Sequence, residues 1–501
     1  MKWLILLLLT LNYSCVSGIN EEKFCDIKSQ GFLLASIFYE QRKEPYCYFS
    51  NLASVTYSYP RTSYVFLDNI PITNLVPRIS GPITTYSVSP ALPSGLVLNS
   101  STGVISGTAI SGSPETNYTF SAKGTNTITA NFVIKIRVGT TTAIRVYGQS
   151  GDFSCGEINR SRSSCITSTP TANSLRLPIG MHEDSTGNLY VSDSVNKRVL
   201  YFPKGTTTAS RVYGQNGDFT AAVPNNGGIS ASSLSDIRNV IVGLNDSLFI
   251  VEFDNHRALS YTVNSTVATG VFGQNGSFTT NVNSPVNAST LNGPQHLVQD
   301  SSGGIYIADG FNSRVLYYPN GSTTATRVYG QNGSFTTNTA GITANSLNLP
   351  IALALDSTSG LFIVDFTNNR VLHYPKDSTV PDRVYGQFGS YTCANSANNN
   401  GSCVSVPTSP NANSLSSPRG IAVDAYDNVY ISDGSNHRIL FYQGTSTTPT
   451  RVYGQAGSFT TQVVNNGGIS ASSLNQPLRL YIDPDGGLYA ADQLNNRILY
   501  Y

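Results

Sequence analysis

The sequence predicts an all-β fold, a six-bladed β-propeller preceded by a small β-sandwich. Three observations predict it. One long sequence block recurs along the chain, a second short string recurs with it, and the composition is rich in Gly (44 residues) and Tyr (29 residues) while charged residues make up 12%. Many short strands joined by turns have such a composition. Blocks that recur at a regular spacing indicate a repeat architecture.

The long block begins at Ala172 and reads ANSLRLPIGMHEDSTGNLYVSDSVNKRVLYF. Each copy holds three apolar runs separated by turns. The alternation over Leu189–Ser192 is the spacing of a half-buried strand, and the Asp, Gly and Asn residues of the turns favour hairpins. We therefore expect three strands in each copy. The six copies begin at Ala172, Ala231, Ala288, Ala344, Ala412 and Ala471.

The short string, RVYGQ, supplies a fourth strand. The first copy precedes the first long block, and the last long block ends at Tyr501 with no RVYGQ after it. A ring of four-stranded blades closes if the strand at 145–149 pairs with the strand at 497–501, because this pairing removes the open sheet edges. The copies begin at Arg145, Arg211, Arg327, Arg383 and Arg451, with the variant GVFGQ at Gly270.

The fifth block resembles an NHL repeat. Its three runs, Pro418–Asp424, Asn428–Asp433 and Asn436–Arg438, follow the NHL pattern almost residue for residue, and the resemblance extends over 145–501. It implies a six-bladed propeller at 139–501. Members of this family are ligand-binding platforms in adhesion receptors, sensor domains and RNA-binding tripartite-motif proteins, and one branch is a peptide-amidating lyase. The fold does not choose among these functions.

Residues 54–138 interrupt the repeats. The runs Leu92–Leu96 and Thr102–Gly107, LPSGL and TGVISG, resemble the Ig-like domain of bacterial and some eukaryotic surface proteins. Short Val, Ile and Tyr strands separated by Pro and Gly turns make a β-sandwich that serves as a spacer or an adhesive module. The segment 19–53, which contains a cysteine pair, has no assignment.

The first eighteen residues have the layout of a secretory signal peptide. Lys2 precedes an apolar run from Trp3 to Leu11, and small residues follow at Val16–Gly18, as cleavage requires. No later stretch approaches the roughly 20 apolar residues that span a bilayer. We therefore expect a secreted, extracellular protein without a membrane span.

The cysteines support the same compartment. Of the seven, Cys15 lies in the leader. The other six form local pairs, which in an oxidising compartment indicates disulfides, whereas a zinc site usually has a CxxC step that this sequence lacks. The expected pairs are Cys25 with Cys47, Cys155 with Cys165, and Cys393 with Cys403.

An acidic residue stands five positions before an arginine in every blade. Asp193 before Arg198 is the first example, and Glu252 before Arg257 is the one case with glutamate. A single substrate cannot use six copies of one pair. We therefore expect buried pairs that join two strands.

Positions that differ between blades are better candidates for a site. After the proline of each block, where the innermost strand begins beside the central channel, polar residues replace the glycine of the family in several blades. Such residues can form a cationic pocket for a carboxylate or a sulfate. Because the channel of a propeller is filled with water, a solvated pore lining is the interpretation we favour. The candidate ligand-binding residues are Arg238, Asn239, Gln295, His296, Arg419 and Arg479.

Long polar stretches connect the blades, for example from Asn216 and from Ala456. Loops of this length are uncommon without a role, and six of them leave from one face and form a rim around the channel. Two of the six hold a cysteine pair. A disulfide there rigidifies the rim and lowers the entropy lost on binding, or serves only to resist proteases.

These features favour a binding or adhesion protein over an enzyme. The formal net charge of +1 argues against a nucleic-acid partner, so we expect an extracellular protein or carbohydrate partner, no cofactor and no catalytic residue. Metalloprotease, nucleophile-elbow and phosphate-loop motifs are missing from the sequence. The alternative is a metal-dependent lyase or hydrolase in which His182 and His296 point into the channel.

Overall fold

The computed structural model describes residues 56–124, 126–159, 165, 167–393, 398, 400–404 and 410–501. They belong to two units, Met1–Arg137 and Val138–Tyr501. The predicted leader 1–18, the segment 19–53 and the pair of Cys25 with Cys47 lie outside the described residues. No helix in the described part of the chain is long and apolar enough to cross a membrane.

The first unit is an Ig-like β-sandwich. Its largest sheet has the order β2-β8-β7-β4, with β2 parallel to β8 and the other pairs antiparallel. Two small sheets, β1-β3 and β5-β6, accompany it. The strands are β1 (Thr56–Ser58), β2 (Ser63–Leu67), β3 (Arg78–Ser80), β4 (Thr85–Ser89), β5 (Leu96–Leu98), β6 (Ile105–Gly107), β7 (Ser113–Lys123) and β8 (Thr127–Arg137).

Aromatic side chains form the core of this unit. Phe120 of β7 and Phe132 of β8 stack with ring centroids 4.2 Å apart, and the edges of Tyr59 and Tyr64 meet the ring of Phe132. Alternate residues of β8 are buried from Phe132 to Ile136, as expected for a strand with one face toward the core.

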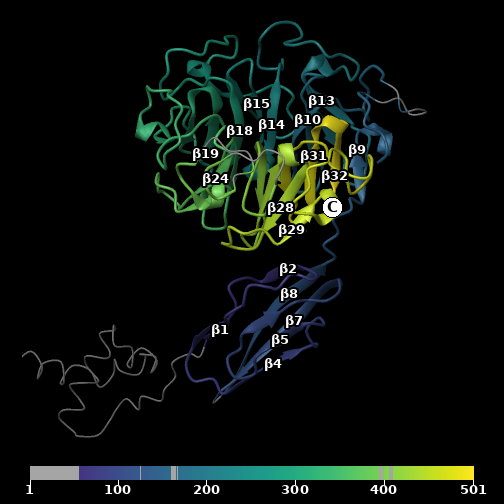
Figure 1. Ribbon diagram of the computed structural model, residues 1–501, viewed down its shortest axis with the longest axis vertical. Helices are drawn as coiled ribbons and strands as arrows, with labels where there is room; N and C mark the ends of the chain where they lie inside the picture. Colours follow the sequence, from purple (N-terminus) through teal and green to yellow (C-terminus); the bar gives the residue numbers. More distant parts are fainter. Residues whose placement is uncertain are drawn as a thin grey trace, which may run out of the picture. The chain divides into compact units, whose positions relative to one another are not determined.

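The second unit is a β-propeller, whose strands run from blue through green to yellow in Figure 1. Its described residues form six four-stranded sheets, here called sheets 1 to 6 in chain order. Within each sheet, neighbouring strands pair antiparallel. They are also consecutive in the chain, except that the last strand of sheet 6 comes from the start of this unit. Sheet 1 contains β10 (Pro178–Glu183), β11 (Leu189–Asp193), β12 (Arg198–Phe202) and β13 (Arg211–Tyr213). Sheet 2 contains β14 (Ile237–Val242), β15 (Leu248–Glu252), β16 (Arg257–Tyr261) and β17 (Gly270–Gly273). Sheet 3 contains β18 (Pro294–Gln299), β19 (Ile305–Asp309), β20 (Arg314–Tyr318) and β21 (Arg327–Tyr329). Sheet 4 contains β22 (Pro350–Leu355), β23 (Leu361–Asp365), β24 (Arg370–Tyr374) and β25 (Arg383–Tyr385). Sheet 5 contains β26 (Pro418–Val423), β27 (Val429–Asp433), β28 (Arg438–Tyr442) and β29 (Arg451–Tyr453). Sheet 6 contains β30 (Pro477–Ile482), β31 (Leu488–Asp492), β32 (Arg497–Tyr500) and β9 (Arg145–Tyr147).

The sheets form a closed ring. The first strand of each sheet lies against the first strand of the next, and β30 of sheet 6 lies against β10 of sheet 1. Sheet 6 is completed by β9, the first strand of this unit in the chain, which pairs antiparallel with β32 so that Leu499 faces Val146. The pairing gives sheet 6 the same four strands as the other sheets and joins the two ends of the propeller.

The ring has two distinct faces because strand direction alternates in each sheet. The turns between first and second strands, such as Gly243–Ser247, lie at one face, here called the turn face. The long segments that run from the fourth strand of one sheet to the first strand of the next lie at the other, the loop face.

A tight turn follows each outer strand. Gly148, the glycine of the first RVYGQ string, has φ 80° and ψ −172°, a conformation open to glycine alone, which explains why the string keeps this residue. The next glutamine starts a 3₁₀ helix, and its buried side chain binds backbone carbonyls; Gln215 donates to those of Lys197 and Val223. The 3₁₀ helices after the outer strands are η2 (Gln149–Gly151), η3 (Gln215–Gly217), η5 (Gln274–Gly276), η7 (Gln331–Gly333), η8 (Gln387–Gly389) and η10 (Gln455–Gly457), and the others are η4 (Leu244–Asp246), η6 (Gly310–Asn312), η9 (Gly434–Asn436) and η11 (Gln493–Asn495).

The predicted acid–arginine pairs are confirmed as buried structural pairs. In each of the six, the Nε of the arginine lies 2.6 to 2.8 Å from a carboxylate oxygen, and both side chains are at most 1% exposed. The guanidinium also holds the loops on either side of its sheet: Arg198 donates to the carbonyls of Ser174 and Phe219. Each pair thus fixes the loop face as well as two strands.

Candidate functional site

A pocket of about 440 Å³ occupies the central channel and is lined by residues from all six first strands. It extends from Asn239, His296 and Arg479 to Gly243 and Leu244 in the turn after β14. The pocket therefore opens toward the turn face. Between these ends its wall is mainly aliphatic, with Ile241, Leu353 and Ile421 among its residues.

Arg479 crosses the channel. Its guanidinium donates hydrogen bonds to the backbone carbonyls of Gln295, Ile351 and Arg419, which belong to the first strands of sheets 3, 4 and 5. The side chain is 3% exposed, and its Nε has no partner among the described residues. A cation is thus bound at the centre of the ring by neutral oxygens, and its Nε–H is buried without an acceptor among the described residues.

Small neighbours make room for this arginine. Arg479 occupies the second position after the proline, where the other sheets have Gly180, Asn239, His296, Ala352 and Gly420. A Cβ added at Gly420 would lie 2.0 Å from the carbonyl oxygen of Leu478. The channel at this level therefore has no room for a large side chain from all six sheets at once.

The electrostatic environment of Arg479 is positive. Burial, together with the nearby charges of Arg238 and Arg419, lowers the pKa of Arg479 to about 9. The unfavourable energy of a desolvated cation is relieved by an anion that approaches it. This geometry is suited to hold a carboxylate or a sulfate.

Two histidines face the same pocket. The amide of Leu353 donates to Nδ1 of His296 over 3.3 Å, so the neutral ring has its proton on Nε2. Nδ1 of His182 lies 2.8 Å from the carbonyl of Glu183, which leaves its Nε2 as an acceptor. Burial lowers the pKa of His182 to about 4 and that of His296 well below its ordinary value. Both rings are uncharged at neutral pH.

The structure separates the six candidate residues into two groups. Asn239, His296 and Arg479 line the pocket. Arg238, Gln295 and Arg419 do not: each lies at a register shift near the start of its strand, on the loop-face side. They therefore lie outside the pocket that the first group lines.

The two arginines on the loop-face side have local partners. Arg238 lies 2.6 Å from Asp236 and its guanidinium is 4.4 Å from the ring centroid of Phe253. Arg419 lies over Phe366, and burial lowers its pKa. Nε of each arginine is buried without a hydrogen-bond partner among the described residues.

Among the described residues, no metal-binding cluster includes His182 or His296. Across the described ranges, no three His, Cys, Asp or Glu side chains gather closely enough to hold a metal ion. Of the other histidines, His256 and His437 accept hydrogen bonds from the amides of Gly293 and Gln476, so both have a structural role.

The predicted rim loops are held to the sheets by aromatic residues. An aromatic residue follows the turn after each outer strand, and Phe219, Phe278 and Phe459 pack against core clusters. The carbonyl of the same residue is bound by the buried arginine of its sheet; Arg438 and Phe459 are one such pair. These half-buried aromatic side chains and the arginine hydrogen bonds hold the loops to the sheets.

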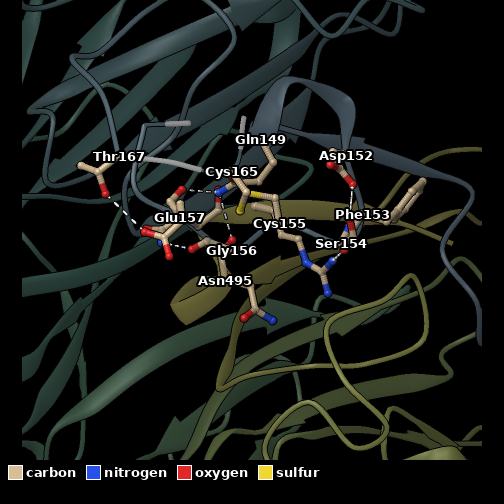
Figure 2. Close-up of a disulfide and its surroundings, with 12 residues drawn as sticks. Gln149, Asp152, Phe153, Ser154, Cys155, Gly156, Glu157, Cys165, Thr167 and Asn495 are labelled. Carbon is tan, nitrogen blue, oxygen red and sulfur yellow. Dashed lines mark hydrogen bonds between the residues drawn. A yellow bond between two sulfur atoms is a disulfide. The ribbon is translucent and has the colours of Figure 1, made fainter. Parts of the chain in front are cut away.

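The predicted disulfides Cys155–Cys165 and Cys393–Cys403 are confirmed, with Cα atoms 5.7 and 5.3 Å apart. The first lies beside the junction of the ring. Figure 2 shows it next to Gln149, which donates to the carbonyls of Glu157 and Asn495 over 2.8 and 3.1 Å. The disulfide therefore holds the loop that follows β9, and the start of this loop also makes a hydrogen bond to Asn495, just before β32.

Comparisons with known proteins agree with this architecture. Residues 49–139 match the family model described as "Putative Ig domain", and residues 415–441 match the NHL repeat. The chain thus combines an Ig-like domain with an NHL-type propeller. A search of curated proteins found no match.

Solved structures with a similar fold include three bacterial proteins. A structural genomics protein of unknown function from Bacteroides thetaiotaomicron has 13% identity and a TM-score of 0.49, with 89% of this chain and 97% of that chain covered. Virginiamycin B lyase from Staphylococcus aureus has 11% identity and a TM-score of 0.36, with coverage of 66% and 86%. A gluconolactonase from Xanthomonas campestris has 14% identity and a TM-score of 0.39, with coverage of 66% and 88%.

Proposed function

We propose that this protein is an extracellular binding or adhesion protein whose channel pocket holds an anionic group of a protein or glycan ligand. Arg479 is the observation that supports the proposal: a buried cation bound to backbone oxygens, with an unpartnered Nε, at the inner end of a pocket of about 440 Å³. Pockets of roughly 300–1,000 Å³ take small molecules or the end of a larger ligand.

The neighbouring groups suit a carboxylate with an apolar body. Arg479 and Nε2 of His296 supply donors at the inner end, and the aliphatic walls take the rest of the group. A carboxylate that enters exchanges water for charge-assisted hydrogen bonds, which are about twice as strong as neutral ones. The C-terminal carboxylate of a peptide and the carboxylate of an acidic sugar are the two ligand groups to test.

The location outside the cell is part of the proposal. The two disulfides within the propeller are compatible with an oxidising compartment, where such bonds persist. An Ig-like domain joined to a propeller agrees with a role at a surface, because such domains serve as spacers or adhesive modules.

A ligand array tests the proposal. The full chain is screened against peptides with free or amidated C-termini and against acidic glycans or their neutral, reduced forms. We expect binding to the free carboxylates. Arg479→Gln should weaken it by at least about tenfold, the value of one charge-assisted hydrogen bond. Arg419→Gln removes a nearby charge that does not line the pocket, so it should weaken binding less than Arg479→Gln.

A second variant separates the loss of the site from the loss of the fold. Ala354 lines the pocket and is 7% exposed, so Ala354→Phe fills the pocket without removing Arg479 and should also block the ligand. Loss of binding in Arg419→Gln alone would place the site on the loop face. Stoichiometric zinc that disappears in His182→Gln or His296→Gln would favour an enzyme and contradict the proposal.

A further inference from the structure

A row of three side chains crosses sheet 1 from its second to its fourth strand. Tyr190 faces Tyr201, and Tyr201 faces Arg211. The guanidinium of Arg211 lies 4.7 Å from the ring centroid of Tyr201 and donates to the hydroxyl of Tyr213 over 3.4 Å. A cation over an aromatic face is attracted by the ring electrons. The arginine therefore completes the outer side of the sheet.

Three other sheets contain the same arrangement. In each, the first residue of the fourth strand is an arginine that lies over an aromatic ring and donates to a tyrosine hydroxyl two residues further on. The pairs are Arg327 over Tyr317 at 5.1 Å, Arg383 over Phe362 at 5.5 Å and Arg145 over Tyr500 at 5.5 Å, with hydroxyl acceptors on Tyr329, Tyr385 and Tyr147.

Sheet 2 lacks three members of this arrangement at once. Its row reads Phe249, Ser260 and Gly270, and Phe272 replaces the tyrosine that accepts the hydrogen bond. The arginine, one ring and the hydroxyl are therefore missing together. The rest of the sheet is intact, since the buried pair of Glu252 and Arg257 is present.

A pocket of about 550 Å³ lies where these groups are missing. Phe249, Ser260, Gly270, Phe272 and Asn320 line it, and we call it the sheet-2 slot. The two phenylalanines are 7% and 8% exposed, compared with 1% and 0% for their counterparts in sheet 4, Phe362 and Tyr385. In sheet 4 the arginine covers the second-strand ring, Phe362, and the counterpart of that ring in sheet 2, Phe249, has no arginine over it and is slightly more exposed.

The aromatic walls of the slot keep the geometry of the filled sheets. The ring centroids of Phe249 and Phe272 are 6.4 Å apart with an interplanar angle of 47°, and those of Phe362 and Tyr385 are 6.0 Å apart at 53°. Among the described residues that line the slot, none is Lys, Arg, Asp or Glu. A cation that enters therefore meets no positive charge in the wall.

Acceptors for such a cation are in place as well. Arg211 reaches Oδ1 of Asn264 over 3.1 Å, and Arg327 reaches Oδ1 of Asp377 over 2.8 Å. Both acceptors lie between the third and fourth strands of the next sheet. The corresponding turn beside the slot contributes Asn320 and Gly321 to its wall, and the first acceptor shows that a neutral amide suffices.

We propose that the sheet-2 slot binds an arginine side chain of a partner protein, whose guanidinium takes the position that the chain's own arginine has in four other sheets. The slot shares Leu244 and Gln299 with the wall of the channel pocket but contains neither Arg479 nor the two channel histidines, so the proposal does not rest on the ligand proposed there. A single side chain contributes modest affinity, and the slot acts as a specificity contact within a larger interface.

Small-molecule probes test the chemistry. Binding of N-acetyl-arginine amide to the full chain is followed by ligand-observed NMR and compared with N-acetyl-citrulline amide, which has a neutral urea of the same shape. We expect binding of the arginine probe and at least about tenfold weaker binding of citrulline, because the cation–π attraction is lost. Equal binding of citrulline, or stronger binding of a neutral methyl glycoside, would overturn the proposal.

Variants that copy the residues of the other sheets supply the structural control. Ser260→Tyr, Gly270→Arg and Phe272→Tyr together restore the row of sheet 1 and should abolish binding while the protein stays folded. The changes are made together because a Cβ at Gly270 would lie 2.4 Å from Oγ of Ser260. The reverse triple variant, Tyr201→Ser, Arg211→Gly and Tyr213→Phe, should create a second arginine site. Undiminished arginine binding by the filled variant would refute the assignment.

Discussion

The side chain of Gln149 donates a 2.9 Å hydrogen bond to the carbonyl oxygen of Asn496, a residue 347 positions further along the chain. Asn496 returns the contact, because its Nδ2 donates to the carbonyl of Gly156 over 2.8 Å. Arg497 also binds the carbonyl of Phe153. In the other sheets the corresponding bonds join neighbouring segments. At this junction the same bonds connect the two ends of the propeller.

Disruption of this junction should destabilise the whole ring. Val146 is 2% exposed and faces Leu499, so Val146→Asp buries a carboxylate without a partner. We expect the free energy of unfolding to fall by more than about 3 kcal/mol. Denaturant unfolding followed by circular dichroism measures the change. Ile144→Asp is the control, since Ile144 is 65% exposed; an equal loss in both variants would contradict the expected role of the junction.

The buried pairs should show the asymmetry of ion pairs in a low-dielectric interior. Arg438→Met leaves the carboxylate of Asp433 buried without its cation and should cost about 3–5 kcal/mol. The double variant Asp433→Leu/Arg438→Met removes both charges and should recover part of that loss. The unfolding free energies of the three proteins form the test. A double variant less stable than Arg438→Met would show that the loop hydrogen bonds of the arginine dominate.

The repeats predict the strands well because burial of alternate or continuous apolar residues leaves a clear pattern. The second strands, such as Leu189–Asp193, are buried throughout, and their runs recur in every block. The outer strands are shorter than expected: β9 ends at Tyr147, since the conformation of Gly148 turns the chain away. The string RVYGQ thus contains both a strand and the turn that ends it.

The site could be predicted only in part because it depends on irregular register. In β14 the pairing skips Arg238, whereas in β30 it skips both Leu478 and Arg479. Sequence alone does not show the length of such a bulge, so it cannot separate side chains that face the pocket from those that face the loops. The slot in sheet 2, in contrast, has a visible signal: GVFGQ departs from RVYGQ in the same sheet where Ser260 replaces an aromatic residue.

Acid should lower the free energy of unfolding through the titration of the channel histidines. Burial lowers the pKa of His182 to about 4, while an unfolded histidine titrates near about 6.5. Between these values the unfolded chain binds more protons than the folded chain, so the free energy of unfolding falls as pH falls. A shift of this size corresponds to about 3 kcal/mol, and the partial exposure of His182 reduces the expected loss to about 1–2 kcal/mol.

Urea unfolding at about pH 7 and about pH 4.5 measures this dependence, since the second value lies between the two pKa values. His182→Gln removes the titrating group and should flatten the pH dependence. His296→Gln should have a similar effect, because burial and the charge of Arg479 lower the pKa of His296 as well. An unchanged slope in both variants would assign the acid sensitivity to other groups.

His373 of sheet 4 should be replaceable by tyrosine, the residue at the same position in sheet 6. His373 lies 2.9 Å from Oδ2 of Asp356 through Nε2, and this bond contributes to a pKa of Asp356 well below its ordinary value. In sheet 6 the same position is Tyr500, whose hydroxyl donates to Asp483 over 2.8 Å. His373→Tyr should therefore keep a hydrogen-bond donor for the carboxylate of Asp356 and change the free energy of unfolding by less than about 1 kcal/mol.

His373→Leu is the matched variant that removes the donor. His373 is 4% exposed, so the substitution leaves Asp356 with its bonds to Thr358 and Gly360 but without this partner, and it should cost about 1–3 kcal/mol. The carboxylate with a depressed pKa stabilises the fold above its unfolded pKa, and this contribution decreases as pH falls. The difference between the two variants should thus be largest at neutral pH and shrink in acid; a difference independent of pH would attribute the effect to packing alone.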